Sequence, residues 1–85
     1  MREFFEVDDV ESFIRVAQNS NVVVRADPYV LANVYGMVFF IDLNTLARQD
    51  VARLFTALKE KLVVVKSAES KSSIAEFLRE KRASQ

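Results

Sequence analysis

The sequence predicts an α/β domain of the α+β type, an open-faced sandwich in which helices cover one face of a sheet. Strand-length runs rich in β-branched residues alternate with segments whose apolar residues recur at helical spacing. Their order along the chain is β-α-β-β-α-β-α, and 85 residues are enough for one domain with one core. We therefore expect a single domain over residues 1–85, with about four mainly antiparallel strands.

The first strand and helix are predicted from the N-terminal quarter of the chain. Residues 4–7 include two phenylalanines and predict a short strand. Asp8 or Asp9 then begins a helix, because Asp8 with Glu11 three positions later has the form of a capping box. The helix has one apolar stripe at i, i+3, i+4, i+7 spacing, made of Val10, Phe13, Ile14 and Ala17.

The middle of the chain leaves one alternative open. Residues 22–26 begin with three valines and predict a strand, which Asp27-Pro28 ends in a turn. The segment from 29 to 43 is apolar nearly throughout, so periodicity does not separate a buried strand from a buried helix. Its β-branched and aromatic content favours a strand for at least Val34 to Ile41, with a helix over residues 33–43 as the alternative.

The second half predicts helix, strand and helix. Asn44 or Thr45 caps a helix to about Lys61, whose core stripe is Ala47, Val51, Leu54, Phe55 and Leu58. Residues 62–65 predict a buried strand. A polar connector over residues 67–73 offers several helix caps, and the last helix then carries the apolar stripe Ile74, Phe77 and Leu78.

The composition removes most enzyme chemistry. The chain has no cysteine and no histidine, so it lacks a thiolate nucleophile, the commonest metal ligand and the usual general base near neutral pH. Its single glycine does not support a phosphate-cradling loop. The serines near Lys66 and Lys71 match no Ser-Lys motif and are expected to cap a helix. We predict a protein that is not an enzyme, with no catalytic residue, cofactor or metal site.

The charges balance overall but not along the chain. Residues 1–43 hold three basic and seven acidic side chains, net −4, whereas residues 44–85 hold nine and five, net +4. Such a split is suited to head-to-tail or partner contacts, or it reflects ordinary solvated faces. The N-terminal residues have no signal-peptide pattern, and no stretch approaches the roughly 20 apolar residues of a membrane span. We expect a cytoplasmic protein without membrane contact.

Two adjacent phenylalanines predict an interface. In a strand, Phe39 and Phe40 point to opposite faces, and only one can enter a core beneath helices on a single face. The other is then exposed or covered by a partner. The predicted partner surface comprises Tyr35, Met37, Phe39, Phe40 and Ile41. We expect a homo-oligomer, in the simplest case a symmetric dimer.

Several segments resemble the family of the phosphocarrier HPr. The family's first helix is similar to residues 9–17. Its hairpin and second helix are similar to residues 29–31 leading to 36–43, and its last strand and helix are similar to residues 61–65 followed by 73–78. The resemblance implies a helix over Asn33 to Leu43, with the family's regulatory serine falling near Asn33. The family's phosphorylated histidine has no counterpart, so the resemblance implies a regulator that binds but does not transfer phosphate.

The sequence thus predicts a non-enzymatic intracellular interaction or regulatory domain that self-associates. One alternative is the HPr-like regulator that has lost its histidine. The other is a nucleic-acid-binding module with Arg25, Tyr35 and Lys66 on one sheet face, although no ribonucleoprotein-type aromatic motif is present. Nucleic acid is the less expected partner, because the net charge is zero.

Overall fold

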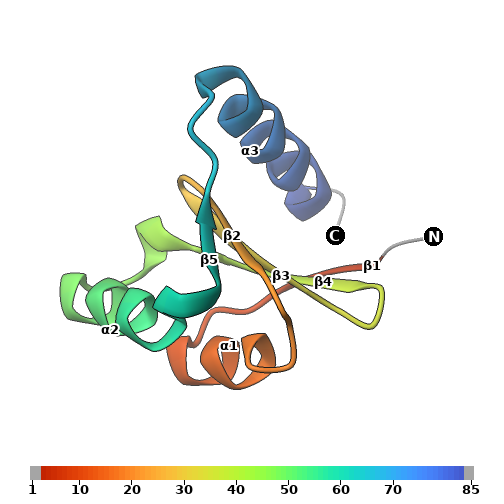
Figure 1. Ribbon diagram of the computed structural model, residues 1–85. Coiled ribbons are helices and arrows are strands. Elements are labelled where there is room, and N and C mark those ends of the chain that lie inside the picture. The colour runs from red at the N-terminus through yellow and green to blue at the C-terminus, as the bar shows by residue number, and fades with distance from the viewer. Residues whose placement is uncertain (1–2, 84–85) are drawn as a thin grey trace.

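The protein folds as a mixed five-stranded sheet between helices on both of its faces (Figure 1). The structure is a computed structural model and describes residues 3–83. Its elements are β1 (Glu3–Glu6), α1 (Val10–Ala17), β2 (Val23–Ala26), β3 (Tyr29–Val34), β4 (Met37–Asp42), the 3-10 turn η1 (Leu43–Thr45), α2 (Arg48–Leu58), the 3-10 turn η2 (Lys59–Lys61), β5 (Leu62–Val64) and α3 (Ala68–Ala83).

The strand order is β1-β4-β3-β2-β5. β3 is antiparallel to both of its neighbours, whereas β1 pairs with β4 and β2 pairs with β5 in parallel. The α+β class is therefore confirmed, but the prediction of about four mainly antiparallel strands is wrong. Helical connections explain the difference, because β1 leads through α1 to β2, and β4 through α2 to β5. A helical connection returns the next strand in the same direction.

The helices form two layers, not one. α1 and α2 cover one face of the sheet, and α3 packs on the other (Figure 1). We call these the α1/α2 face and the α3 face. The core of the α1/α2 face contains Val10, Phe13, Ala17, Val23, Val30, Ala32, Ile41, Leu54 and Leu58. A smaller core on the α3 face contains Tyr29, Phe40, Ala75 and Leu78. The prediction that helices cover one face is wrong, because residues 65–67 carry the chain to the opposite side.

The ambiguous central segment is a β-hairpin. The strand predicted from Val34 to Ile41 is interrupted at Tyr35 and Gly36, where both residues have positive φ, 52° and 82°. The register, with Val34 opposite Met37, leaves only these two residues for the turn. Hairpins this tight favour positive φ at both turn positions. The helix that the HPr resemblance implied between Asn33 and Leu43 is absent.

The second helix begins later than predicted. α2 starts at Arg48 with Ala47 as its cap residue, and no side chain caps it. Asn44 and Thr45 belong instead to η1, where the Asp42 carboxylate accepts a hydrogen bond from the Asn44 amide at 2.9 Å. Ala47 is exposed rather than in the core. Leu54 and Leu58 are buried as predicted, whereas Val51 and Phe55 are only partly buried.

The last strand and helix also depart from the prediction. β5 is an edge strand rather than a buried one, and Val63 and Val64 expose 52% and 42% of their surface. α3 begins at Ala68, within the predicted polar connector. Ser67 caps it as expected, since its hydroxyl oxygen accepts a hydrogen bond from the Ser70 amide at 3.3 Å.

Candidate functional site

An apolar groove lies between α3 and the sheet, with a volume of about 490 Å³. We call it the α3 groove. Its floor comes from every strand of the sheet except β5, and its wall is one side of α3. The lining consists of Phe4, Val22, Val24, Leu31, Asn33, Val38, Ser73, Ile74, Phe77 and Leu78. None of these side chains is titratable, so the groove suits a partner surface that is uncharged and apolar.

The groove exists because both faces of β2 and β3 are apolar while one helix covers the second face. Val23 points into the core of the α1/α2 face, so strand alternation places Val22 and Val24 on the α3 face. Leu31 joins them there, next to Val24 in the β2–β3 register. α3 covers the opposite part of this face, where Tyr29 and Phe40 are buried. The part of this face around Val22, Val24 and Leu31 is left open.

The rim of the groove is partly exposed to solvent. Val22 exposes 49% of its surface and Phe77 exposes 44%. Phe77 is held by an edge-to-face contact with Phe4, and the Lys81 ammonium lies 5.6 Å from the centroid of the Phe77 ring. Large apolar side chains that remain half exposed around an apolar floor are typical of a binding surface.

The predicted partner surface is not continuous in the structure. Phe39 and Phe40 do point to opposite faces, as predicted, but Phe40 is buried beneath α3 and Ile41 is buried beneath α1 and α2. Phe39 stacks on Phe5 with ring centroids 5.3 Å apart. Met37 is partly buried beside the hairpin turn. Tyr35 alone is fully presented to solvent, 90% exposed at the hairpin tip.

Sequence reasoning missed the residues that line the groove. The valine run at 22–24 predicts a strand, but the prediction does not assign the valines to the two faces of the sheet. The alternation itself was the available signal, since Val22 and Val24 are both apolar on the face opposite Val23. Phe77 was assigned to the core stripe of the last helix, whereas the structure places it at the groove rim.

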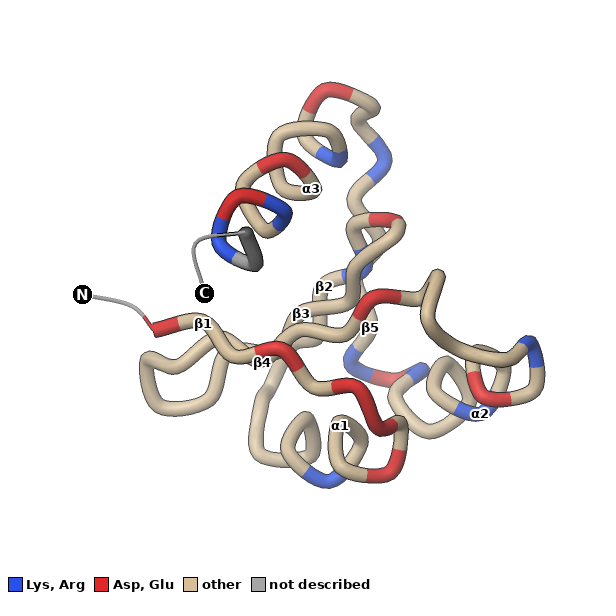
Figure 2. The backbone as a smooth tube through the Cα atoms, turned by 180° about the vertical axis from the view of Figure 1, so that it is seen from behind, with Lys and Arg blue, Asp and Glu red and all other residues tan. Residues whose placement is uncertain are grey.

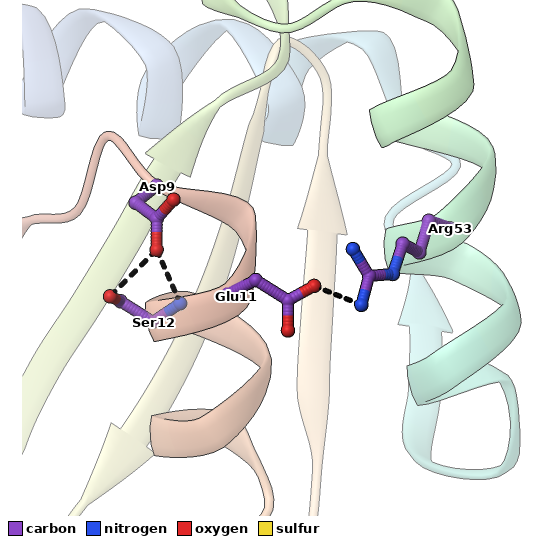
Figure 3. A network of polar contacts seen from close by, with 4 residues as sticks. All are labelled: Asp9, Glu11, Ser12 and Arg53. Atoms are coloured by element: carbon purple, nitrogen blue, oxygen red, sulfur yellow. Dashed lines mark hydrogen bonds and ion pairs between the residues drawn. The ribbon is translucent and has the colours of Figure 1, made fainter.

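The acidic residues at the start of α1 have structural roles (Figure 3). Asp9, not Asp8, caps the helix, and its carboxylate accepts hydrogen bonds from the Ser12 amide and hydroxyl, both at 2.8 Å. These two bonds, the hydroxyl's first, hold the pKa of Asp9 below its ordinary value, and the Arg15 and Arg53 charges lower it further. Glu11 forms an ion pair with Arg53 of α2 rather than closing a capping box. Over residues 3–83, no group of acidic side chains is arranged to hold a metal ion.

The three residues of the predicted nucleic-acid surface, Arg25, Tyr35 and Lys66, do not form one surface. The Arg25 guanidinium lies over the Phe55 ring at 4.3 Å and pairs with Asp27 at 3.0 Å. Tyr35 lies at the tip of the β3–β4 hairpin, and Lys66 follows the edge strand β5. Arg25 and Lys66 lie close together, because the Arg25 carbonyl accepts a hydrogen bond from the Val65 amide at 2.9 Å, but Tyr35 lies at the other end of β3.

The described part of the chain contains no helix that is both long and apolar enough to cross a membrane. No protein-family model, no curated protein and no solved structure matches this chain.

Proposed function

We propose that this chain is a non-enzymatic protein-interaction domain whose α3 groove receives the apolar face of an amphipathic helix from a partner protein. One observation carries the proposal. Two helices, α1 and α2, cover one face of the sheet, whereas α3 alone leaves an apolar strip of the other face open. A partner helix lying beside α3 would bury that strip.

The chemistry of the lining favours binding over catalysis. Asn33 and Ser73 are the polar residues of the lining, and the other lining residues are apolar. General acid-base catalysis needs a titratable group within hydrogen-bond reach of the reacting atom, and a serine nucleophile needs an adjacent base. The lining supplies neither. A few polar groups in an apolar surface orient a bound partner.

The shape of the groove favours a helix over a small molecule. Pockets for small molecules enclose most of the ligand surface. Here Val22 and Phe77 stand half exposed at the rim, so a small ligand would keep much of its surface in water. A helix in a groove presents its apolar residues to the floor and keeps its polar face in solvent. The floor residues Val24, Leu31 and Val38 would contact those apolar side chains.

Site-specific photo-crosslinking in the native cell tests the proposal. A photoreactive amino acid replaces Phe77 at the groove rim, and the matched control replaces Thr56, which is exposed on α2. The crosslinked segment is then made as a synthetic peptide and titrated into the purified protein. We expect the peptide to become helical and to shift the methyl resonances of Val24, Leu31 and Val38.

A charge in the groove floor provides the second measurement. Val24→Asp buries a carboxylate against the docked helix, which costs enough to weaken peptide binding at least about tenfold. Thr56→Asp should leave the affinity unchanged. Equal crosslinking from Thr56, adducts with small molecules only, or a peptide that leaves the three methyl resonances unmoved would each overturn the proposal.

A further inference from the structure

The two edge strands of the sheet have complementary sequences. β1, at one edge, reads Glu-Phe-Phe-Glu over residues 3–6, and β5, at the other, is flanked by lysines in Lys-Leu-Val-Val-Val-Lys over residues 61–66. We call them the β1 edge and the β5 edge. Each pairs with one neighbouring strand and, within residues 3–83, no strand covers its outer side. A strand edge of this kind has backbone groups available for pairing with another chain.

Both edges present apolar side chains to solvent. Phe5 is exposed on β1, and Val63 and Val64 are about half exposed on β5. Natural proteins usually protect an edge strand with charges, bulges or covering loops. In β1, Glu3 and Glu6 lie within the strand at either end of two phenylalanines, whereas β5 is entirely apolar and has lysines on both sides. This arrangement permits pairing with a strand whose flanking charges are opposite.

The flanking charges are opposite at the two edges. Residues 2–11 hold five acidic side chains and one arginine, and one of the acidic residues, Glu11, is paired with Arg53, whereas residues 59–66 hold three lysines and one glutamate. The Lys61 ammonium donates to the carbonyl oxygens of Gln18 and Ser20 at 3.2 and 2.9 Å, which fixes it at the base of β5. Figure 2, seen from behind, shows the acidic run along β1 and the start of α1. The acidic residues of β1 and the lysines that flank β5 thus lie at opposite edges of one sheet.

The strand directions allow a second copy to continue the sheet. β1, β4, β2 and β5 all run the same way, because only β3 is reversed. A copy placed beside the first in the same orientation therefore brings its β1 edge parallel to the β5 edge. Phe4 and Val63 both lie on the α3 face, and Phe5 and Val64 both lie on the α1/α2 face. The apolar side chains of the two strands then match face for face.

We infer that this protein associates head to tail with further copies of itself, through parallel pairing of the β5 edge of one copy with the β1 edge of the next. Two symmetric arrangements compete with this one. Pairing two β5 edges brings lysines together, and pairing two β1 edges brings Glu3 and Glu6 against their counterparts. Groups of like charge repel each other and groups of opposite charge attract at separations below the Debye length, so the acidic β1 edge favours the lysine-flanked β5 edge. A head-to-tail contact repeats from copy to copy and gives open polymers unless the rotation between copies closes a ring.

Sedimentation equilibrium on the full chain tests the inference. Because each ladder is only three or four residues long, the association is weak, and the weight-average mass should rise above 9.7 kDa only at high protein concentration. Raising the salt from about 0.02 M to about 0.5 M should reduce the mass, since flanking charges contribute to the contact. Two variants then block one edge each, Phe5→Lys and Val64→Glu. Circular dichroism and thermal unfolding first establish that both are folded.

The pattern across the variants identifies the contact. Head-to-tail association predicts that each variant alone stays at 9.7 kDa and that mixing the two restores a higher mass. In the mixture, the intact β1 edge of one variant pairs with the intact β5 edge of the other. If Phe5→Lys alone still associates, the contact is a symmetric β5 pairing, and if Val64→Glu alone still associates, it is a symmetric β1 pairing. Either result overturns the inference, as does a wild-type mass of 9.7 kDa at every concentration.

A groove variant separates this inference from the proposed function. Leu31→Asp alters the floor of the α3 groove on β3, a strand that pairs with neither edge strand. It should lose the partner peptide while keeping the concentration-dependent mass. Loss of both properties in this variant would place the self-association in the groove and overturn the edge contact.

Discussion

The rings of Phe4 and Phe77 meet edge to face, with centroids 5.1 Å apart and an interplanar angle of 68°. Phe4 belongs to the first strand and Phe77 to the last helix, so this contact joins the two ends of the chain. The Lys81 ammonium lies within 6 Å of both ring centroids, at 5.7 and 5.6 Å. The Phe4 and Phe77 rings both line the α3 groove and connect α3 to the first strand.

Truncating the two neighbouring residues of α3 should have unequal effects. Leu78 is fully buried, so Leu78→Ala should lower the free energy of unfolding by about 2–5 kcal/mol. Phe77→Ala should cost about 1 kcal/mol, because the side chain is half exposed and loses mainly its contact with Phe4. Urea denaturation measures both. A larger loss for Phe77→Ala would mean that α3 lies on the sheet through a different side.

The core of the α1/α2 face can be probed at Leu54. Leu54 has no exposed surface, and Leu54→Ala should cost about 2–5 kcal/mol. Thr56→Ala, two residues along α2 and exposed, serves as the control and should change stability by less than about 0.5 kcal/mol. Chemical denaturation measures the free energy of unfolding of both variants. Similar losses of stability in the two would contradict the packing of α2 described above.

The cap of α1 should give a pH-dependent contribution to stability. The pKa of Asp9 is lowered in the folded protein, chiefly by the Ser12 hydrogen bonds, so the ionised carboxylate favours folding. This contribution is present in full above the ordinary pKa of 3.8 and is lost as the pH falls through the lowered value. Asp9→Ala should be less stable than wild type at neutral pH, with the difference shrinking in acid. Thermal unfolding across this range measures it, with Asp8→Asn as the control that leaves the cap intact.

The β3–β4 turn should respond in opposite directions to two substitutions. Tyr35 occupies a left-handed conformation that L-residues adopt at a cost of about 1–2 kcal/mol, and asparagine tolerates it better. Tyr35→Asn should therefore raise the free energy of unfolding by about 0.5–1 kcal/mol. Gly36→Ala should lower it by about 1 kcal/mol through backbone strain alone, since no atom lies within 4 Å of the added methyl group. Equal effects in calorimetry would contradict this turn geometry.

Local patterns predicted most of the elements. The helix at Val10–Ala17, the strand at Val23–Ala26 and the preference for strand in the central segment all follow from periodicity and β-branched content. The turn at Tyr35 does not follow from these patterns, because tyrosine is not a typical turn residue. Its positive φ is imposed by the pairing of Val34 with Met37. Two residues decided where the predicted long strand had to break.

The candidate site was harder to predict than the elements. Val22, Val24 and Leu31 are apolar on the face opposite the main core, and the sequence does not state which face receives which helix. That choice depends on how residues 65–67 carry the chain from β5 to α3, which is a long-range property of the fold. The prediction of an apolar second face therefore depends on Phe39 or Phe40, without a choice between them, and not on the valines; Phe40 is the one on that face, and α3 covers it.

The reversal of β3 has a consequence for the order of folding. Its two antiparallel pairings join β2, β3 and β4 through two turns of two residues each, so this meander forms with short loops. Pairing β1 with β4 instead joins residues 3–6 to 37–40, and pairing β2 with β5 joins 23–25 to 62–64, which closes much longer loops. We expect the meander to be structured in the transition state, with high φ-values at Val30 and Ile41. The outer strands then form last and open first, and while they are unpaired the edges of β4 and β2 are open to pairing with a strand of another chain.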